Sequence, residues 1–208
     1  MTDHSSPQSI RTEAIESLLI EKDLLTADAV DAVITTYTER VGPMNGAKLV
    51  ARAWTDPDFK ARLLTDATSV VEEYQFEGGQ VEKLIVRECT AFDHHVVVCT
   101  LCSCYPWAVL GLPPAWYKDP AYRSRIVSEP RQVLAEMGLN LSESTRINVC
   151  DSSAEIRYFV LPKRPEGSEA LSEAELAAMV TRDAMIGVAH VPLPGPINRS
   201  SPMARLPL

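Results

Sequence analysis

The sequence has no apolar run that approaches the length of a transmembrane span, and it has no excess of positive charge. A membrane-spanning helix needs about 20 consecutive apolar residues, so we expect the chain not to cross a membrane. Its 28 acidic residues outnumber its 20 basic ones, for a formal net charge of −8. Phosphate backbones and anionic lipids repel such a chain, and we expect neither nucleic acid nor a membrane surface as a partner.

Cysteine is scarce, and it is not dispersed. The chain has five cysteines, and three of them fall between positions 99 and 104. An odd count clustered in this way is unlike the disulfide framework of a small secreted protein. Residues 1–7 also lack the basic and then apolar segments of a secretory signal. We therefore expect a cytoplasmic protein.

Hydrophobic periodicity predicts a helical first part of the chain. Apolar residues recur at helical spacing, and a threonine and two prolines stand where helices begin. The four predicted helices start near Ile10, Thr26, Pro43 and Pro57. Gly78-Gly79 marks a boundary, so residues 9–77 are predicted to form a helical arm. Its apolar stripe suits packing on its own domain or on another subunit.

The second part mixes strands and short helices. β-branched runs predict strands at residues 81–86, 95–98, 147–149 and 156–161. Prolines punctuate short helices between them, and Ser172-Glu-Ala-Glu175 is a capping-box pattern that starts another helix. We predict an α+β fold in which a disordered N-terminus (residues 1–8) and the helical arm (9–77) precede a compact α+β domain (78–190) and a Pro-rich tail (191–208).

The cysteine cluster, Cys99-Thr-Leu-Cys-Ser-Cys104, predicts a metal site. Thiolates are strong ligands for soft and borderline ions, and so short a loop can wrap only one ion. The sulfurs of Cys102 and Cys104 flank the backbone nitrogens of Ser103 and Cys104. If both amides lose their protons, these four atoms close fused chelate rings in a plane, and Cys99 can add an axial sulfur. The sixth position stays open, as in reactive metal sites, and such anionic donors favour trivalent cobalt or iron.

Two simpler interpretations stay open at this point. One is a structural zinc site, although it needs four ligands and neither His94 nor His95 stands at zinc-finger spacing. These histidines lie on a predicted strand, where alternation points them to opposite faces and disfavours joint ligation. The other is a redox dithiol of Cys99 and Cys102, against which the third cysteine argues.

The residues around the cluster resemble those of a known family. The cysteine loop with Tyr105-Pro-Trp107, followed by the stretch from Val109 to Lys118, is similar to the metal loop of the nitrile hydratase α subunit. The resemblance extends over most of the chain. Thr100 stands where the iron branch of the family usually has serine, so the resemblance favours the cobalt type.

The resemblance implies a lyase that hydrates a nitrile to the amide. It implies a metal-binding catalytic domain with one low-spin cobalt(III) ion, iron(III) being less favoured, on Cys99, Cys102, Ser103 and Cys104. Cys102 would be oxidised to the sulfinic acid and Cys104 to the sulfenic acid. The ion would act as a Lewis acid on the nitrile or on a bound water, or the Cys104 sulfenate would attack the nitrile carbon. A heterodimer with a β subunit and an activator protein for metal loading are also implied.

The loop has no positive charge of its own. Thiolates and deprotonated amides carry surplus negative charge, and partly buried charge needs pairing. We expect the nearby cations, Lys118, Arg123, Arg125 and Arg157, to be solvated or paired with acids rather than to form a basic patch. The cations that serve the loop are therefore expected from elsewhere, and the resemblance implies arginines of the β subunit.

Three further residues have two interpretations each. Trp107 is by default a core residue, and the resemblance makes it a wall of an apolar substrate pocket. Gln80 is a turn residue after two glycines, at a position where the family keeps a glutamine near the active site. Asp151 at its simplest binds local amides, and the resemblance makes it a group that orients the surroundings of the metal.

Two residues depart from the family pattern. The family usually has proline at the position of Ala108 and tryptophan at that of Cys150, so we expect a looser loop exit and a changed pocket or subunit contact. Two rival hypotheses remain. One is the metal-bearing subunit of a thiocyanate hydrolase, which shares the cysteine loop. The other is a non-catalytic metal or redox module built on the three cysteines.

Overall fold

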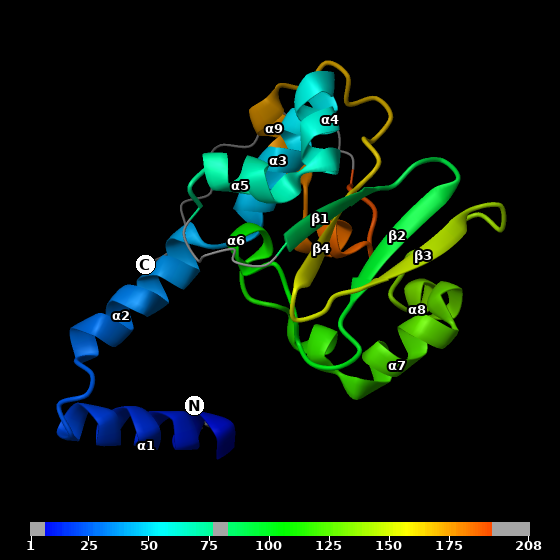
Figure 1. Ribbon diagram of the computed structural model, residues 1–208. Helices are drawn as coiled ribbons and strands as arrows, with labels where there is room; N and C mark the ends of the chain where they lie inside the picture. The colour runs from blue at the N-terminus through cyan, green and yellow to red at the C-terminus, as the bar shows by residue number, and fades with distance from the viewer. Residues whose placement is uncertain (1–6, 77–82, 193–208) are drawn as a thin grey trace, which may run out of the picture. The chain divides into compact units, whose positions relative to one another are not determined.

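The computed structural model describes residues 7–76 and 83–192, and the chain divides into two units, Met1–Arg40 and Val41–Leu208 (Figure 1). The first unit contains α1 (Pro7–Glu21), α2 (Ala27–Thr35) and a π-helical turn, η1 (Thr36–Arg40). Thr26 caps α2 as predicted, because its side chain accepts a hydrogen bond from the Ala29 N–H group. No described side chain between residues 7 and 40 is buried, so this unit has no core of its own.

The second unit begins with α3 (Pro43–Thr55), α4 (Pro57–Thr65) and α5 (Ala67–Glu73). Prolines open α3 and α4, as the sequence predicts, and the Asp56 carboxylate accepts a hydrogen bond from the Phe59 N–H group at 2.9 Å. The predicted fourth helix is two helices. The Asp66 carboxylate accepts from the Ser69 N–H group at 3.2 Å and caps a new start.

The predicted arm of residues 9–77 does not form one unit. Only its first part, up to Arg40, separates from the rest. Helices α3 to α5 bury their apolar stripes in the core of the second unit, where Leu49, Val50 and Leu63 have no exposed surface. Periodicity shows that one face of a helix is buried but not which elements cover it, so the sequence alone did not separate these helices from the arm.

Among the described residues, four strands form two parallel pairs. β1 (Lys83–Glu88) pairs with β4 (Ile156–Leu161), and β2 (Asp93–Val98) pairs with β3 (Arg146–Asp151). The α+β fold is thus confirmed, and all four strands lie where β-branched runs predict them. The second pair aligns Val98 with Asp151, so both strands end at the same edge. The residue after Val98 is the first cysteine of the cluster.

Short helices surround the strands. They are α6 (Trp107–Leu110), a 3₁₀ turn, η2 (Ala115–Lys118), α7 (Pro120–Ser128), α8 (Pro130–Glu136), α9 (Glu173–Met179) and α10 (Arg182–Ile186). In Figure 1, α3, α4, α5 and α9 lie on one side of the strand pairs, and α7 and α8 lie on the other. Ser172 and Glu175 form the predicted capping box of α9.

Parts of the sequence predictions lie outside the described residues. These are the Gly78-Gly79 boundary, the disordered N-terminus up to residue 6 and the tail from residue 193 onward. Within residues 7–76 and 83–192, no helix combines the length and the apolar character needed to cross a membrane.

A close backbone contact fastens α10 to β2. Gly187 ends α10 in the left-handed conformation, with φ of 90°. Its carbonyl oxygen lies 2.7 Å from Nε2 of His94 and, being only an acceptor, receives the ring N–H. A Cβ atom at Gly187 would lie 2.0 Å from the carbonyl oxygen of His95. Only glycine fits here, and the buried residues Met185 and Ile186 are thereby held near β2.

Gly187→Ala should lower the free energy of unfolding by about 3–5 kcal/mol, because the added methyl group meets backbone and positive φ disfavours alanine. Gly138→Ala is the matched control, since Gly138 has φ of 93° and nothing within 4 Å of an added Cβ. It should cost about 1–2 kcal/mol. Chemical denaturation of both full-length variants measures the difference. Equal losses would show that φ alone, and not the contact with His95, makes glycine necessary.

Candidate metal centre

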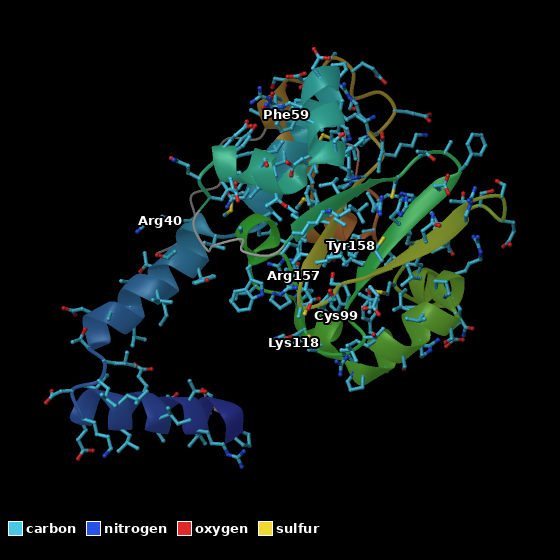
Figure 2. All side chains as sticks on the ribbon, viewed as in Figure 1. Arg40, Phe59, Cys99, Lys118, Arg157 and Tyr158 are labelled. Atoms are coloured by element: carbon cyan, nitrogen blue, oxygen red, sulfur yellow. The ribbon has the colours of Figure 1, made fainter. Side chains whose placement is uncertain are left out.

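The three clustered cysteines lie in a loop that leaves the carboxyl end of β2, where Figure 2 marks Cys99. Their sulfurs all lie within 4.8 Å of one another. Sγ of Cys102 is 3.4 Å from that of Cys99 and 3.0 Å from that of Cys104, and all three are free thiols. In the described part of the chain, no other three histidine, cysteine or acidic side chains lie this close. The loop thus presents three sulfurs to one soft or borderline ion.

The sulfurs differ in burial and in ionisation. Cys99 and Cys104 are buried, whereas Cys102 is exposed. Hydrogen bonds from the thiols of Cys104 and Cys99, and then from the backbone N–H groups of Cys104 and Ser103, lower the pKa of Cys102 to about 7. Burial raises the pKa of Cys104 to about 12. In the metal-free chain Cys102 therefore ionises before Cys104.

Asp151 holds the start of the loop. Its Oδ1 accepts a hydrogen bond from the Thr100 N–H group at 2.9 Å, and its Oδ2 accepts one from the Thr100 hydroxyl at 2.7 Å. The pairing of β2 with β3 brings the two residues together, because it aligns Asp151 with Val98. The interpretation that Asp151 orients the surroundings of a metal agrees with this geometry and stays a prediction.

Two buried tyrosines that the sequence analysis did not single out hold the two ends of the loop. The Tyr122 hydroxyl donates to the Val97 carbonyl at 2.7 Å, and the Tyr117 hydroxyl donates to the Cys104 carbonyl at 3.0 Å. Burial raises the pKa of both phenols, so they stay neutral donors. In the sequence they stand on either side of Asp119-Pro120, where α7 begins, and no local pattern shows that they reach the loop.

The cations expected to be solvated or paired behave differently from one another. Arg125 pairs with Glu129 and Glu136, as expected. Arg157 donates to the Ser153 carbonyl oxygen.

Arg123 instead serves the loop. Its Nη1 donates to the carbonyl oxygen of Cys102 at 2.9 Å. The charge of Arg157 also opposes the rise in the pKa of Cys104. The expectation that the loop's cations come from elsewhere was therefore incomplete. Arg123 lies on α7, 21 positions after Cys102, and sequence spacing does not show that this helix reaches the loop. This chain brings its own guanidinium to the loop.

The remaining residues of interest have varied surroundings. Trp107 opens α6 and is 38% exposed, so it is not a core residue, and its role as a pocket wall stays a prediction. The Ser103 side chain is exposed. Gln80 lies outside the described residues. Ala108 is buried, and its carbonyl accepts a hydrogen bond from Nδ2 of Asn45 at 2.9 Å, which ties the loop exit to α3.

The two histidines before the loop have separate environments. His94 is buried, with Nδ1 3.6 Å from Sγ of Cys89. Nδ1 of His95 lies 3.8 Å from Sγ of Cys150, the residue that stands where the family usually has tryptophan. Neither histidine belongs to the group of metal-ligand side chains found at the loop.

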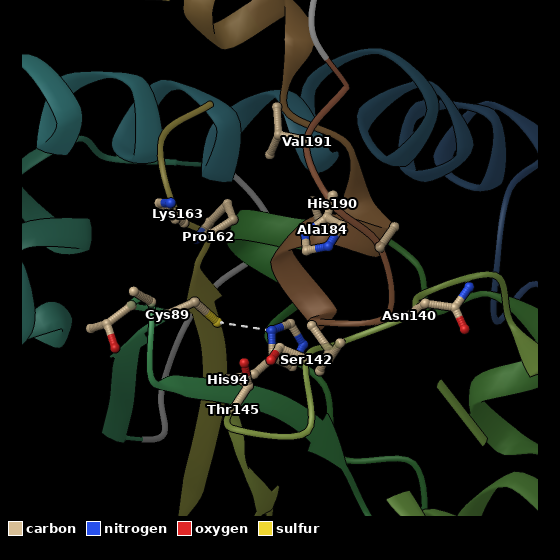
Figure 3. Close-up of a pocket in the computed structure, with 14 residues that line it drawn as sticks. Cys89, His94, Asn140, Ser142, Thr145, Pro162, Lys163, Ala184, His190 and Val191 are labelled. Atoms are coloured by element: carbon tan, nitrogen blue, oxygen red, sulfur yellow. Dashed lines mark hydrogen bonds between the residues drawn. The ribbon is translucent and has the colours of Figure 1, made fainter. Parts of the chain in front are cut away.

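Figure 3 shows a cavity of about 220 Å³ whose lining includes Cys89 and His94. His94 stands near the start of β2, whereas Cys99 follows its end, so this cavity is separate from the metal loop. Burial lowers the pKa of His94 and raises that of Cys89 to about 11. The pair is therefore a neutral hydrogen bond within the structure.

Iodoacetamide should modify Cys102 before the other cysteines of the metal-free chain. Its thiol is exposed with a pKa of about 7, so the reaction rate should rise through neutral pH and level off once the thiolate is complete. Cys104 is buried with a pKa of about 12 and should react at least about 100-fold more slowly at neutral pH. Peptide mass spectrometry measures both rates, and similar rates would contradict this geometry.

Asp151→Asn should weaken metal retention about 10-fold, because the amide loses the charge and one of the two acceptors for Thr100. Asp93→Asn is the matched control, since Asp93 begins the paired strand β2, at the end away from the cysteine loop, and pairs with Arg146. Metal per chain after dialysis against a chelator measures the effect. Equal retention in the two variants would remove Asp151 from the centre.

Comparisons with known proteins bear on the same residues. Residues 6–189 match the family model described as nitrile hydratase, alpha chain. The low-molecular weight cobalt-containing nitrile hydratase subunit alpha of Rhodococcus rhodochrous is 56% identical over 178 residues, 86% of this chain and 86% of the relative. Thiocyanate hydrolase subunit gamma of Thiobacillus thioparus is 40% identical over 218 residues, 99% of this chain and 88% of the relative.

A solved structure of a nitrile hydratase has the same fold as this chain. A double mutant of the Fe-type nitrile hydratase from Comamonas testosteroni Ni1 matches with a TM-score of 0.86 and 42% identity, over 94% of this chain and 97% of that one. The resemblance seen in the cysteine loop thus extends over the whole fold. The chain belongs to the nitrile hydratase α-chain family.

Proposed function

We propose that this chain is the catalytic α subunit of a cobalt-containing nitrile hydratase, which adds water to a small nitrile to give the amide. The observation that carries the proposal is the group of three sulfurs within 4.8 Å, the last two of which flank the backbone nitrogens of Ser103 and Cys104. Membership of the nitrile hydratase α-chain family supports the same reaction.

The residues present fit a trivalent ion. Cys99, Cys102 and Cys104 would supply three sulfurs, and Ser103 and Cys104 two backbone nitrogens. A planar set of anionic nitrogen and sulfur donors suits cobalt(III) or iron(III) better than zinc, which prefers a tetrahedron. Thr100 and the 56% identity to a cobalt-containing relative favour cobalt over the iron of the 42% identical structure. When bound, the ion supplies Lewis acidity.

Each cysteine would have its own task. Cys99, buried just after β2, would hold the ion as an unmodified thiolate. Cys102 would carry two oxygens as the sulfinic acid and Cys104 one as the sulfenic acid, which weakens donation by both sulfurs. The Cys104 oxygen is the candidate nucleophile for the nitrile carbon, and an activated water is the alternative. Trp107 would bound the substrate pocket, and Gln80 would be a catalytic residue near the metal centre.

A β subunit would complete the centre. Nitrile hydratase α subunits work with a β subunit, and two features of this chain suit such a partner. Leu101 is 88% exposed in the middle of the metal loop, where solvent contact is unfavourable for leucine. The first unit exposes apolar side chains and has no core of its own in which to bury them. Arginines of the β subunit would pair with the oxidised cysteines, and an activator protein would load the metal.

Thiocyanate hydrolysis is the second candidate, because the γ subunit of that enzyme is 40% identical over nearly the whole chain. The small side chain of Cys150 beside His95 also alters a position where nitrile hydratases usually have tryptophan. A non-catalytic metal module is the third hypothesis for the loop. In that case the purified protein would have unmodified thiols and no turnover.

Elemental analysis and peptide mass spectrometry of the chain purified with its partner test the centre. We expect one cobalt per chain, with two extra oxygens on Cys102 and one on Cys104. Zinc on three unoxidised thiols would contradict the proposal for the protein so prepared.

Turnover separates the enzymatic candidates. The assembled protein should hydrate simple nitriles faster than it hydrolyses thiocyanate, and the reverse order would favour the second candidate. Cys104→Ser should lower nitrile turnover at least about 100-fold, because it removes a reactive sulfur. Cys89→Ser is the matched control and should stay close to the parent, because Cys89 lines the separate cavity. Full activity of Cys104→Ser with metal retained would exclude Cys104 from the reaction.

A further inference from the structure

We infer that Arg123 is a positioning residue for the metal centre, because its guanidinium holds the peptide between Cys102 and Ser103 with the Ser103 nitrogen turned toward the sulfurs. The inference rests on the proposed function, since it treats that nitrogen as a metal ligand. Arg123 itself binds neither metal nor substrate. It acts through the peptide to which it donates.

The geometry follows from the planarity of the peptide bond. In a trans peptide the C=O and N–H groups point in opposite directions, and the described residues contain no cis peptide bond. Nη1 of Arg123 donates to the Cys102 carbonyl at 2.9 Å. The Ser103 N–H group of the same peptide therefore points away from Arg123 and α7. Fixing the oxygen on the α7 side keeps the nitrogen on the opposite side.

Helix α7 is anchored where Arg123 needs it. The Asp119 side chain accepts a hydrogen bond from the Ala121 N–H group at 2.8 Å and caps the start of the helix. Tyr122, the residue before Arg123, is buried and donates to the Val97 carbonyl at 2.7 Å. The backbone that carries Arg123 is thus tied to the strand that leads into the metal loop, so the donor is held in place before metal binds.

Arg123 also has no carboxylate partner among the described residues. Its Nε–H group is buried and has no acceptor there, whereas Arg125, two positions later, binds Glu129 and Glu136. A partly buried cation without a counter-ion is unfavourable. A peptide nitrogen that ligates a metal shares its negative charge with the carbonyl oxygen of that peptide, and the guanidinium meets this charge in a charge-assisted hydrogen bond.

A purely structural hydrogen bond is the competing explanation. Such a bond needs a donor but no charge, so glutamine would replace arginine without loss. If the charge matters, lysine should replace arginine better than glutamine does. The two substitutions therefore separate the explanations.

The test compares Arg123→Gln, Arg123→Lys and Arg125→Gln in the full chain, co-produced with its β subunit and supplied with cobalt. Arg125→Gln is the matched control, because it removes a guanidinium from the same helix. We expect Arg123→Gln to lose cobalt to a chelator about 10- to 100-fold faster than the parent, with shifted sulfur-to-metal absorption bands. Arg123→Lys should recover most of the retention, and Arg125→Gln should match the parent.

Parent-like cobalt retention and absorption in Arg123→Gln would overturn the inference, as would equal losses in the Gln and Lys variants. If Arg123→Gln does not fold, Arg123→Lys decides the question, since parent-like retention supports the role of charge and a loss of about tenfold or more opposes it. A parent chain without trivalent metal would instead refute the proposed function. The two failures are thus distinguishable.

Discussion

The parallel pairing of β2 with β3 is the constraint on which the metal loop depends. It aligns Val98 with Asp151, so the strand that delivers Cys99 ends beside the strand that delivers the acceptor for Thr100. A register shift of one residue would turn Asp151 to the opposite face of the pair. The Thr100 amide would then lose its acceptor, and the first sulfur would lose its fixed position relative to the other two.

The supports of the loop act on its backbone rather than on its sulfurs. Asp151 binds the amide of Thr100, Tyr117 binds the carbonyl of Cys104, and Arg123 binds the carbonyl of Cys102. These contacts come from three separate elements. Two of the proposed metal ligands are themselves backbone nitrogens, so a contact that sets a peptide plane also sets the direction of a ligand.

Local features of the structure could be predicted from the sequence, and non-local ones could not. The helix starts at Pro43 and Ser172 follow from neighbouring residues, and the three sulfurs meet because six residues hold them together. Helices α3 to α5 were assigned to the arm because periodicity does not identify what covers a helix. The roles of Arg123 and Tyr117 depend on how α7 and η2 lie against β2, which no local pattern encodes. Gln80 remains a prediction.

Because the sulfurs are close in the chain and their supports are distant, the parts of the loop form at different stages of folding. The thiols are neighbours along the chain, so they can capture a soft ion before the domain has folded. The contact between Thr100 and Asp151 spans 51 positions and forms only when the strands have paired, at the entropic cost of closing a long loop. A nascent chain therefore presents its three sulfurs before the contact that shapes the loop has formed.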